Sequence, residues 1–180
     1  SLTRTAYAAL RDYLRMPPDA APRISHGPMD TVRAAEDLLE RYGADTRPLA
    51  LRPPSRTAER PMPDGTYYDE YGHRWRRASY YWDVVEHPLA GKELEDLAAT
   101  PWPDEADEGR YAGMEEEARS LAAGDRCVVF DIPGLGPFEG ACFLRGHGDF
   151  CADLYGDPAF AEALLDKVTD SCIRFWDEIL

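Results

Sequence analysis

The chain lacks any apolar run close to the roughly 20 residues that cross a bilayer as a helix, and it has few basic residues. Only 20 Lys and Arg stand against 34 Asp and Glu, which leaves a net charge of -14 and an isoelectric point near 4.6. Phosphate groups are bound by clustered Lys and Arg, so this balance excludes a general nucleic-acid binder and disfavours an anionic membrane surface. We therefore expect neither nucleic acid nor a membrane as a partner.

Export and disulfide patterns are also missing. The chain begins Ser1-Leu2-Thr3-Arg4, without an initiator Met and without the apolar core of an export signal. This start suggests processing or a fragment of a longer protein. The four cysteines lie at positions 127, 142, 151 and 172 and include no Cys-x-x-Cys pair. Such spacing favours buried, reduced thiols in a soluble cytoplasmic protein.

The sequence contains no P-loop, no complete dinucleotide-binding turn and no zincin motif. Gly134-Leu135-Gly136 could cradle a phosphate at a helix N-terminus, but Pro137 removes one backbone N–H. We interpret this segment as a tight turn that lines a pocket. A hydrophobic share of 44% is nevertheless typical of a globular domain with a real core.

Helical spacing and stop signals divide the first third of the chain. Residues 5–15 predict one helix, and residues 30–39 predict a second that starts at Asp30 and closes at Gly43. Ala44–Leu51 then reads as a short strand, weakened by Pro48. A helix that ends in Gly and leads into a strand indicates half of a repeated α/β unit.

The amino-acid composition changes in the middle of the chain. Residues 52–65 are rich in Pro, Arg and Asp and predict a loop, whereas residues 65–86 are crowded with Tyr and Trp and predict a small antiparallel hairpin. Short and acidic helices are expected near residues 91–98 and 107–123. The hairpin contains the one strongly basic cluster, His73 to Arg77. It is either an anion- or partner-binding face or the solvated side of a strand.

The clearest strand is Cys127–Ile132, an almost continuous apolar run of the kind that is buried on both faces of a parallel sheet. Helices are expected to follow over residues 138–145, 148–155 and 158–179. Asp131 and Glu139 flank the turn after the strand and could do acid–base work at the carboxyl end of a sheet. His147, between two glycines, is either a flexible acid–base or ligating group or an exposed turn residue.

Several segments, taken in order, resemble one family. They are Leu38–Arg47, the Asp-Glu-Tyr-Gly hairpin of Tyr68–Trp75, His87–Ala90 with Leu94–Leu97, Trp102–Asp104, Gly136–Ala141, Leu144–Gly146, Phe150, Asp153-Leu154, Asp157-Pro158 and Leu164–Val168. Their order and spacing resemble the uroporphyrinogen decarboxylase superfamily. The hairpin is similar to an insertion in its corrinoid-linked methyltransferase and O-demethylase branch.

The resemblance implies a (β/α)8 TIM barrel of which residues 1–180 are about the N-terminal half, a single incomplete domain with a hairpin insertion over residues 65–86. Two core-type strands are too few for a complete barrel. It also implies methyl transfer from a small methylated substrate, with a corrinoid protein as partner and with zinc ligands outside this chain. Arg52, Gly134, Phe138 and Glu139 would line the substrate pocket. No catalytic residue is assigned.

Two departures bear on the reaction. Decarboxylases of the superfamily carry an aspartate after the strand matched by Ala44–Leu51, where this chain has Arg52-Pro53-Pro54, and a tyrosine where it has Cys142-Phe143. Both departures argue against uroporphyrinogen as substrate, although a cofactor-free decarboxylase stays an alternative. A third alternative is a non-catalytic half-barrel that binds a partner through the Tyr- and Trp-rich hairpin. An isolated half-barrel would expose sheet edges, so a homodimer is a further expectation.

Overall fold

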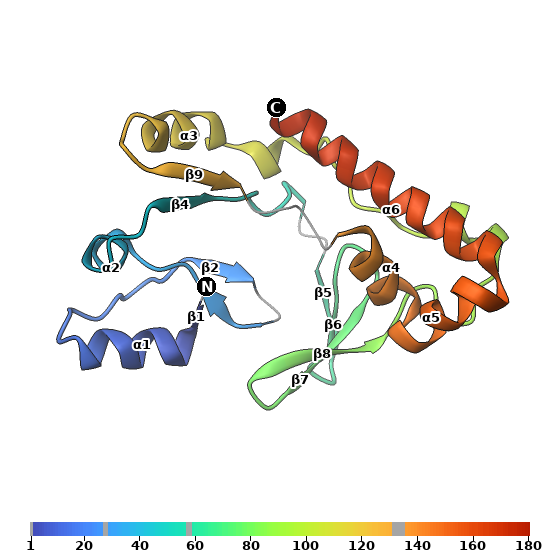
Figure 1. Ribbon diagram of the computed structural model, residues 1–180. Coiled ribbons are helices and arrows are strands. Elements are labelled where there is room, and N and C mark those ends of the chain that lie inside the picture. Colours follow the sequence, from blue (N-terminus) through green and yellow to red (C-terminus); the bar gives the residue numbers. More distant parts are fainter. Residues whose placement is uncertain (1, 27–28, 57–58, 131–135) are drawn as a thin grey trace.

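The computed structural model describes residues 2–26, 29–56, 59–130 and 136–180. Figure 1 shows its parts: α1, α2 and the first strands, the parallel pair β4–β9 beside α3, the antiparallel strands β5–β8, and the helices α4–α6. No helix in these described ranges is long and apolar enough to cross a membrane.

The N-terminal part packs one helix on a small antiparallel sheet. Its elements are β1 (Leu2–Thr3), α1 (Arg4–Tyr13), β2 (Ile24–His26), β3 (Thr31–Val32) and α2 (Glu36–Arg41), with sheet order β1-β3-β2. Tyr7, Val32 and Leu38 form its core. The helix predicted over residues 5–15 is confirmed as α1, whose N-cap Thr3 accepts a hydrogen bond from the Ala6 N–H at 3.3 Å.

The helix predicted to start at Asp30 is wrong in its first half. Asp30 has a positive φ of 47°, whereas an N-cap residue needs extended backbone. Thr31 and Val32 instead pair with β1 and β2, and α2 begins only at Glu36. Gly43 does follow the helix with a φ of 61°, as expected of a glycine that ends a helix.

The two strands expected to form the core of a parallel sheet do pair in parallel. They are β4 (Thr46–Leu49) and β9 (Cys127–Phe130), with Leu49 opposite Phe130, and α3 (Met114–Ala122) packs against both. The expectation that β9 is buried on both faces is wrong, because Cys127 is exposed and Val129 is 44% exposed. One face of this pair is therefore open.

The predicted half of a TIM barrel is contradicted. The described strands form sheets of three, two and four strands, and no barrel closes among them. Only β4 and β9 are parallel, and the remaining pairs are antiparallel. A barrel needs a parallel strand after every helix. Here the strands between β4 and β9 in the chain, β5 to β8, form an antiparallel sheet instead.

That antiparallel sheet confirms the hairpin predicted over residues 65–86. Its strands run in the order β5 (Arg60–Pro61), β6 (Tyr67–Tyr68), β7 (Arg74–Ala78) and β8 (Tyr81–Glu86). The 3-10 helices η1 (Leu94–Ala98) and η2 (Glu108–Tyr111) follow. The single acidic helix expected over 107–123 is divided, because Gly113 adopts a φ of 72° between η2 and α3.

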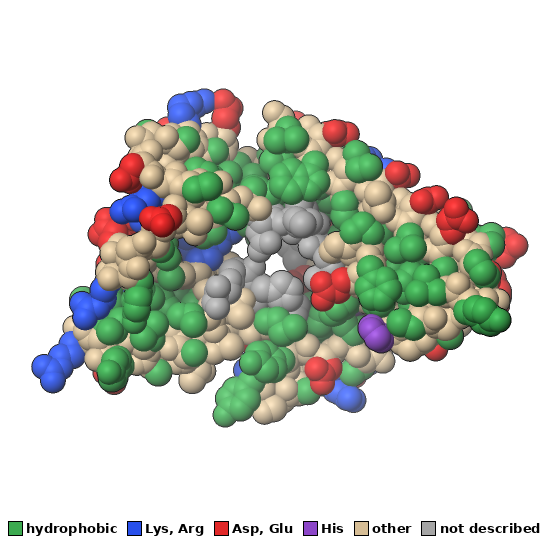
Figure 2. Space-filling model, in the orientation of Figure 1, with side chains coloured by type: hydrophobic (Ala, Val, Ile, Leu, Met, Phe, Trp, Pro, Cys, Tyr) green, Lys and Arg blue, Asp and Glu red, His purple; other side chains and the backbone are tan. Residues whose placement is uncertain are grey.

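The C-terminal helices enclose the main core and confirm the helices predicted there. They are α4 (Pro137–Arg145), α5 (His147–Gly156) and α6 (Pro158–Ile179). The core includes Leu89, Leu144, Phe150, Phe160 and Leu164, each 2% exposed or less. Asp157 caps α6 by accepting a hydrogen bond from the Phe160 N–H at 3.2 Å. Figure 2 shows apolar side chains that remain at the surface over these helices.

Candidate functional site

Arg52 lies three residues beyond β4, and its charge is already matched. Its guanidinium forms an ion pair with Glu117 on α3, and Glu117 also pairs with Arg23 at 3.1 Å. Burial is the largest single influence on Glu117 and opposes its ionisation, but the hydrogen bonds and charges of Arg52 and Arg23 together outweigh it and lower the pKa of that carboxyl. The Arg52 N–H donates to the Arg110 carbonyl at 2.8 Å. Arg52 thus links the loop after β4 to α3, and a bound anion would compete with Glu117 for its guanidinium group.

Phe138 and Glu139 occupy the first turn of α4 and are exposed at the surface. The Phe138 ring meets the edge of Phe150 at a centroid distance of 5.8 Å. No hydrogen bond, ion pair or ring contact joins Arg52 to either of them. Gly134 and Asp131 lie outside the described residues. The pocket predicted from Arg52, Gly134, Phe138 and Glu139 therefore stays a prediction.

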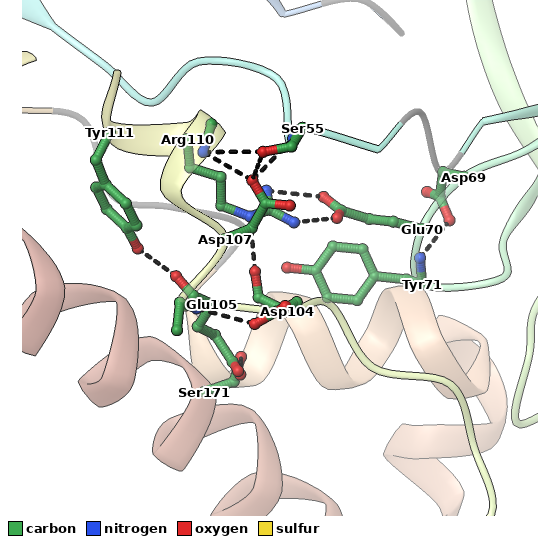
Figure 3. Close-up of polar contacts among 12 residues, drawn as sticks. Ser55, Asp69, Glu70, Tyr71, Asp104, Glu105, Asp107, Arg110, Tyr111 and Ser171 are labelled. Atoms are coloured by element: carbon green, nitrogen blue, oxygen red, sulfur yellow. Dashed lines mark hydrogen bonds and ion pairs between the residues drawn. The ribbon is translucent and has the colours of Figure 1, made fainter. Parts of the chain in front are cut away.

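A network of polar side chains surrounds Arg110 (Figure 3). Arg110 is 5% exposed, and its guanidinium contacts both carboxylate oxygens of Glu70 in the hairpin turn. Its Nε donates to the Asp104 carbonyl at 2.9 Å. The buried charge of Arg110 is matched by the carboxylate of Glu70. This ion pair therefore links the hairpin to the segment around η2.

Asp107 and Glu105 extend the network to the loop after β4 and to α6. Asp107 accepts hydrogen bonds from the Ser55 N–H at 2.8 Å and the Ser55 hydroxyl at 2.7 Å. Glu105 accepts from Ser171 at 2.6 Å and pairs with Arg174 at 2.9 Å, both on α6. Figure 3 shows Asp107 beside Ser55 and Glu105 beside Ser171. The network joins four segments that are distant in sequence.

Asp69 organises a second group on the hairpin. Its carboxylate accepts from the backbone N–H groups of Tyr71 at 3.0 Å and His73 at 2.9 Å, from His73 Nδ1 at 2.9 Å and from Trp75 Nε1 at 2.8 Å. Burial raises the pKa of Asp69, but these hydrogen bonds dominate and lower it below its ordinary value. An ionised carboxylate only accepts, so His73 Nδ1 carries a proton.

The other ring nitrogen of His73 is the unusual atom of this group. His73 is 5% exposed, and its Nε2 is buried with no hydrogen-bond partner among the described residues. Its ring contacts those of Tyr71, Trp75 and Phe143 at centroid distances of 5.8–6.1 Å. A neutral imidazole held at Nδ1 by a carboxylate presents a lone pair at Nε2, which suits hydrogen-bond acceptance, proton transfer or metal ligation.

Zinc, which the resemblance implies, does not fit the part of the chain that is described. No group of three or more His, Cys, Asp or Glu side chains there is arranged to hold a metal ion. Zinc sites in proteins are built from three or four such ligands. No chemical step is therefore assigned to a metal on these residues, and His147, which is exposed, belongs to no such group.

The sequence analysis did not single out Asp69, Glu70 or Arg110 as organising residues, although the first two stand in the hairpin motif. A local signal existed for Asp69 and His73, because an acid and a histidine four residues apart around a glycine can meet across a turn. Arg110 gave no signal, since its partner lies 40 residues away. Compared with known proteins, the chain matches no family model, no curated protein and no solved structure.

Proposed function

We propose that this chain forms part of the substrate-binding region of an enzyme that transfers a methyl group from a small methylated molecule. One observation carries the proposal: segments that resemble the uroporphyrinogen decarboxylase superfamily, including the hairpin that is similar to its methyltransferase branch, contact α4. The rings of His73 and Trp75 contact Phe143 at centroid distances of 6.1 and 6.0 Å. His87 Nδ1 bonds the Phe143 carbonyl at 2.5 Å, and the Leu89 N–H donates to the Leu144 carbonyl at 2.9 Å.

This convergence supports a binding role because Phe138 and Glu139 lie in the first turn of α4. Residues that hold a substrate need rigid support, and here a hairpin and a loop pack against the helix that carries them. Arg52 follows β4, and α4 follows β9. Ligands of α/β proteins commonly bind beyond the carboxyl ends of neighbouring parallel strands, so the order of Arg52 after β4, and of Phe138 and Glu139 after β9, supports a proposed role in substrate binding.

Two contacts favour methyl transfer over decarboxylation of a porphyrinogen. Binding several carboxylates needs unmatched cations, and the guanidinium of Arg52 is paired with Glu117. The position expected to carry a tyrosine hydroxyl reads Cys142-Phe143, neither of which has a hydroxyl group, and Cys142 is 5% exposed and belongs to the main core. A small methylated phenol or amine requires neither unpaired cations nor a tyrosine hydroxyl for its binding.

On this proposal the zinc ligands lie outside this chain and the corrinoid belongs to a partner protein. Zinc would activate a thiol acceptor, and the corrinoid would carry the methyl group. The described side chains would hold and orient the donor molecule: Phe138 offers an exposed ring, and Glu139 a carboxylate suited to an amine or a hydroxyl group.

A second function, a partner-binding module, is favoured by the tip of the hairpin. Tyr80 is 72% exposed, Tyr81 46% and Val85 39%. Ser79 turns the chain there with a φ of 59°. Exposed tyrosines on a rigid hairpin suit protein recognition, because they offer large contact area at low entropic cost.

The two functions are separated by one assay on the protein purified from its natural source. Reduced cobalamin is mixed with the protein, zinc and a panel of methylated phenols and methylamines, and methylcobalamin is followed by its absorbance. Methyl transfer that falls at least tenfold in Phe138→Ala, but not in the equally exposed control Leu154→Ala, supports the proposal. Absence of transfer from every donor contradicts it and leaves the partner-binding module.

A further inference from the structure

A cavity of about 300 Å³ lies where the tip of the β7–β8 hairpin faces α1 (Figure 1). Its walls include Ala6 and Ala9 on α1, Asp30 before β3, and Tyr80 and Tyr81 at the hairpin tip. This volume is at the lower end of the range of roughly 300–1,000 Å³ that is typical of small-molecule sites. The cavity therefore has room for one small ligand.

The two tyrosines of this cavity are presented by a tight turn. Ala78 pairs with Tyr81 across the hairpin, so only Ser79 and Tyr80 connect the two strands, and Ser79 turns the chain with a φ of 59°. Tyr80 is 72% exposed and Tyr81 46%. Both residues line the cavity while they remain exposed, so their aromatic rings are available to a ligand.

Asp30 gives the cavity a negative charge. Its carbonyl accepts a hydrogen bond from the Arg4 N–H at 2.9 Å, and its Oδ1 accepts one from Arg4 Nε at 3.1 Å. Its second carboxylate oxygen, Oδ2, makes no hydrogen bond to the residues that the structure describes. The net charge of -14 on the whole chain also attracts cations and repels anions. The electrostatics of the cavity therefore favour a cationic ligand.

We propose that this cavity binds a small quaternary ammonium molecule, with its methylated nitrogen between the tyrosines and Asp30. The faces of aromatic rings attract cations, and quaternary ammonium groups are bound in this way. A primary ammonium has three N–H donors to satisfy, whereas a quaternary one has none and suits the methyl groups of Ala6 and Ala9. The proposal is independent of the methyl-transfer function, because it concerns other residues and is tested by binding alone.

The first test compares choline with 3,3-dimethylbutan-1-ol, a molecule of the same shape in which an uncharged carbon replaces the nitrogen. Each is titrated into the full-length protein, and the backbone amide signals of Ala6, Ala9, Tyr80 and Tyr81 are followed by NMR. We expect choline to bind about tenfold more tightly than the uncharged molecule. Equal affinities, or no shift of these signals with choline, would overturn the proposal.

Variants of the tyrosines test whether the rings bind the cation. Tyr80→Leu and Tyr81→Leu keep an apolar side chain but remove the ring, and each should weaken choline binding about threefold. Tyr80→Phe keeps the ring and should retain the affinity. Tyr155→Leu is the control, since Tyr155 is 95% exposed on α5 and outside the cavity, and it should change nothing. Unchanged choline affinity in both leucine variants of the hairpin tip would show that the rings play no part.

Asp30→Asn tests the charge separately. Asn, like Asp, adopts a positive φ readily, so the variant keeps the φ of 47° at this position and should fold. It removes the carboxylate and leaves the charge of Arg4 unpaired beside the cavity, so choline should bind about threefold more weakly. Unchanged affinity would contradict a cation site. A trimethyl-lysine peptide that binds while choline does not would assign the cavity to a protein partner and equally overturn the proposal.

Discussion

Arg110 and Glu70 are joined by a two-pronged ion pair between η2 and the hairpin turn, although 40 residues separate them in the chain. Arg110 is 5% exposed, and the Glu70 side chain is 24% exposed. The pair, with the Asp104 carbonyl, fixes the antiparallel sheet to the segment that leads into α3. Four predictions start from contacts of this kind.

Removing the charge of Glu70 should be costly. Glu70→Gln leaves the guanidinium of Arg110 buried without its counter-charge, and we expect a loss of about 3 kcal/mol in the free energy of unfolding. Glu116→Gln, which removes an exposed partner of Arg119, is the control and should change it by less than about 1 kcal/mol. Urea unfolding measures both. Equal effects of the two variants would show that the buried pair contributes little.

Acid should weaken the hairpin through Asp69. Its pKa in the folded protein is lower than the ordinary value of 3.8 for an aspartate. A carboxyl with a depressed folded pKa adds stability above its unfolded pKa, and this stability is lost as the pH falls through the folded pKa. Asp69→Asn should therefore flatten the dependence of unfolding free energy on pH below about 4. Trp75→Phe, which removes one donor, should flatten it less, and an unchanged slope in Asp69→Asn would refute the assignment.

Two phenylalanines of α6 and α4 should differ strongly in their contribution to stability. Phe160 is fully buried in the main core beneath the guanidinium of Arg145, 4.3 Å from its ring centroid, whereas Phe138 is 51% exposed. Phe160→Ala should cost about 3–5 kcal/mol through lost burial and a cavity. Phe138→Ala should cost no more than about 1 kcal/mol. Thermal unfolding of the two variants compares them, and a similar loss in both would place Phe138 in the core.

Two glycines flanking His147 should respond to alanine with opposite signs. Gly146 has a φ of 99°, and a Cβ there would lie 3.4 Å from His87, so Gly146→Ala should destabilise the protein by about 1–3 kcal/mol. Gly148 lies in α5 with open space around it, so Gly148→Ala should stabilise by about 0.5–1 kcal/mol. Chemical denaturation checks both signs. Stabilisation by Gly146→Ala would contradict the strained junction.

The candidate site could be predicted only in part. The resemblance implied that Arg52, Phe138 and Glu139 line a substrate pocket; they lie after β4 and β9, and the pocket itself stays a prediction. The pairing of Arg52 with Glu117, 65 residues later, had no local signal. Asp69 and His73 both stand in the Tyr68–Trp75 motif, but the burial of His73 Nε2 depends on Phe143 and on the rest of the packing.

The sequence by itself determined the local elements. Proline and a capping aspartate begin α6, apolar residues at helical spacing continue it, and positive-φ glycines such as Gly43 and Gly113 end or divide helices. These signals act over a few residues, because hydrogen bonds and side-chain contacts within a helix are local. The tyrosine-rich hairpin was predictable for the same reason.

Only the tertiary structure decided how the strands pair. Thr31 and Val32, which the sequence pattern assigned to a helix, pair with strands of an antiparallel sheet. The strand β4 pairs in parallel with β9, about 80 residues later, and neither has a second parallel neighbour among the described strands. Strand pairing depends on contacts between distant segments, and a strand's own residues do not specify its partner. For this reason the parallel pair was foreseen while the barrel inferred from it was wrong.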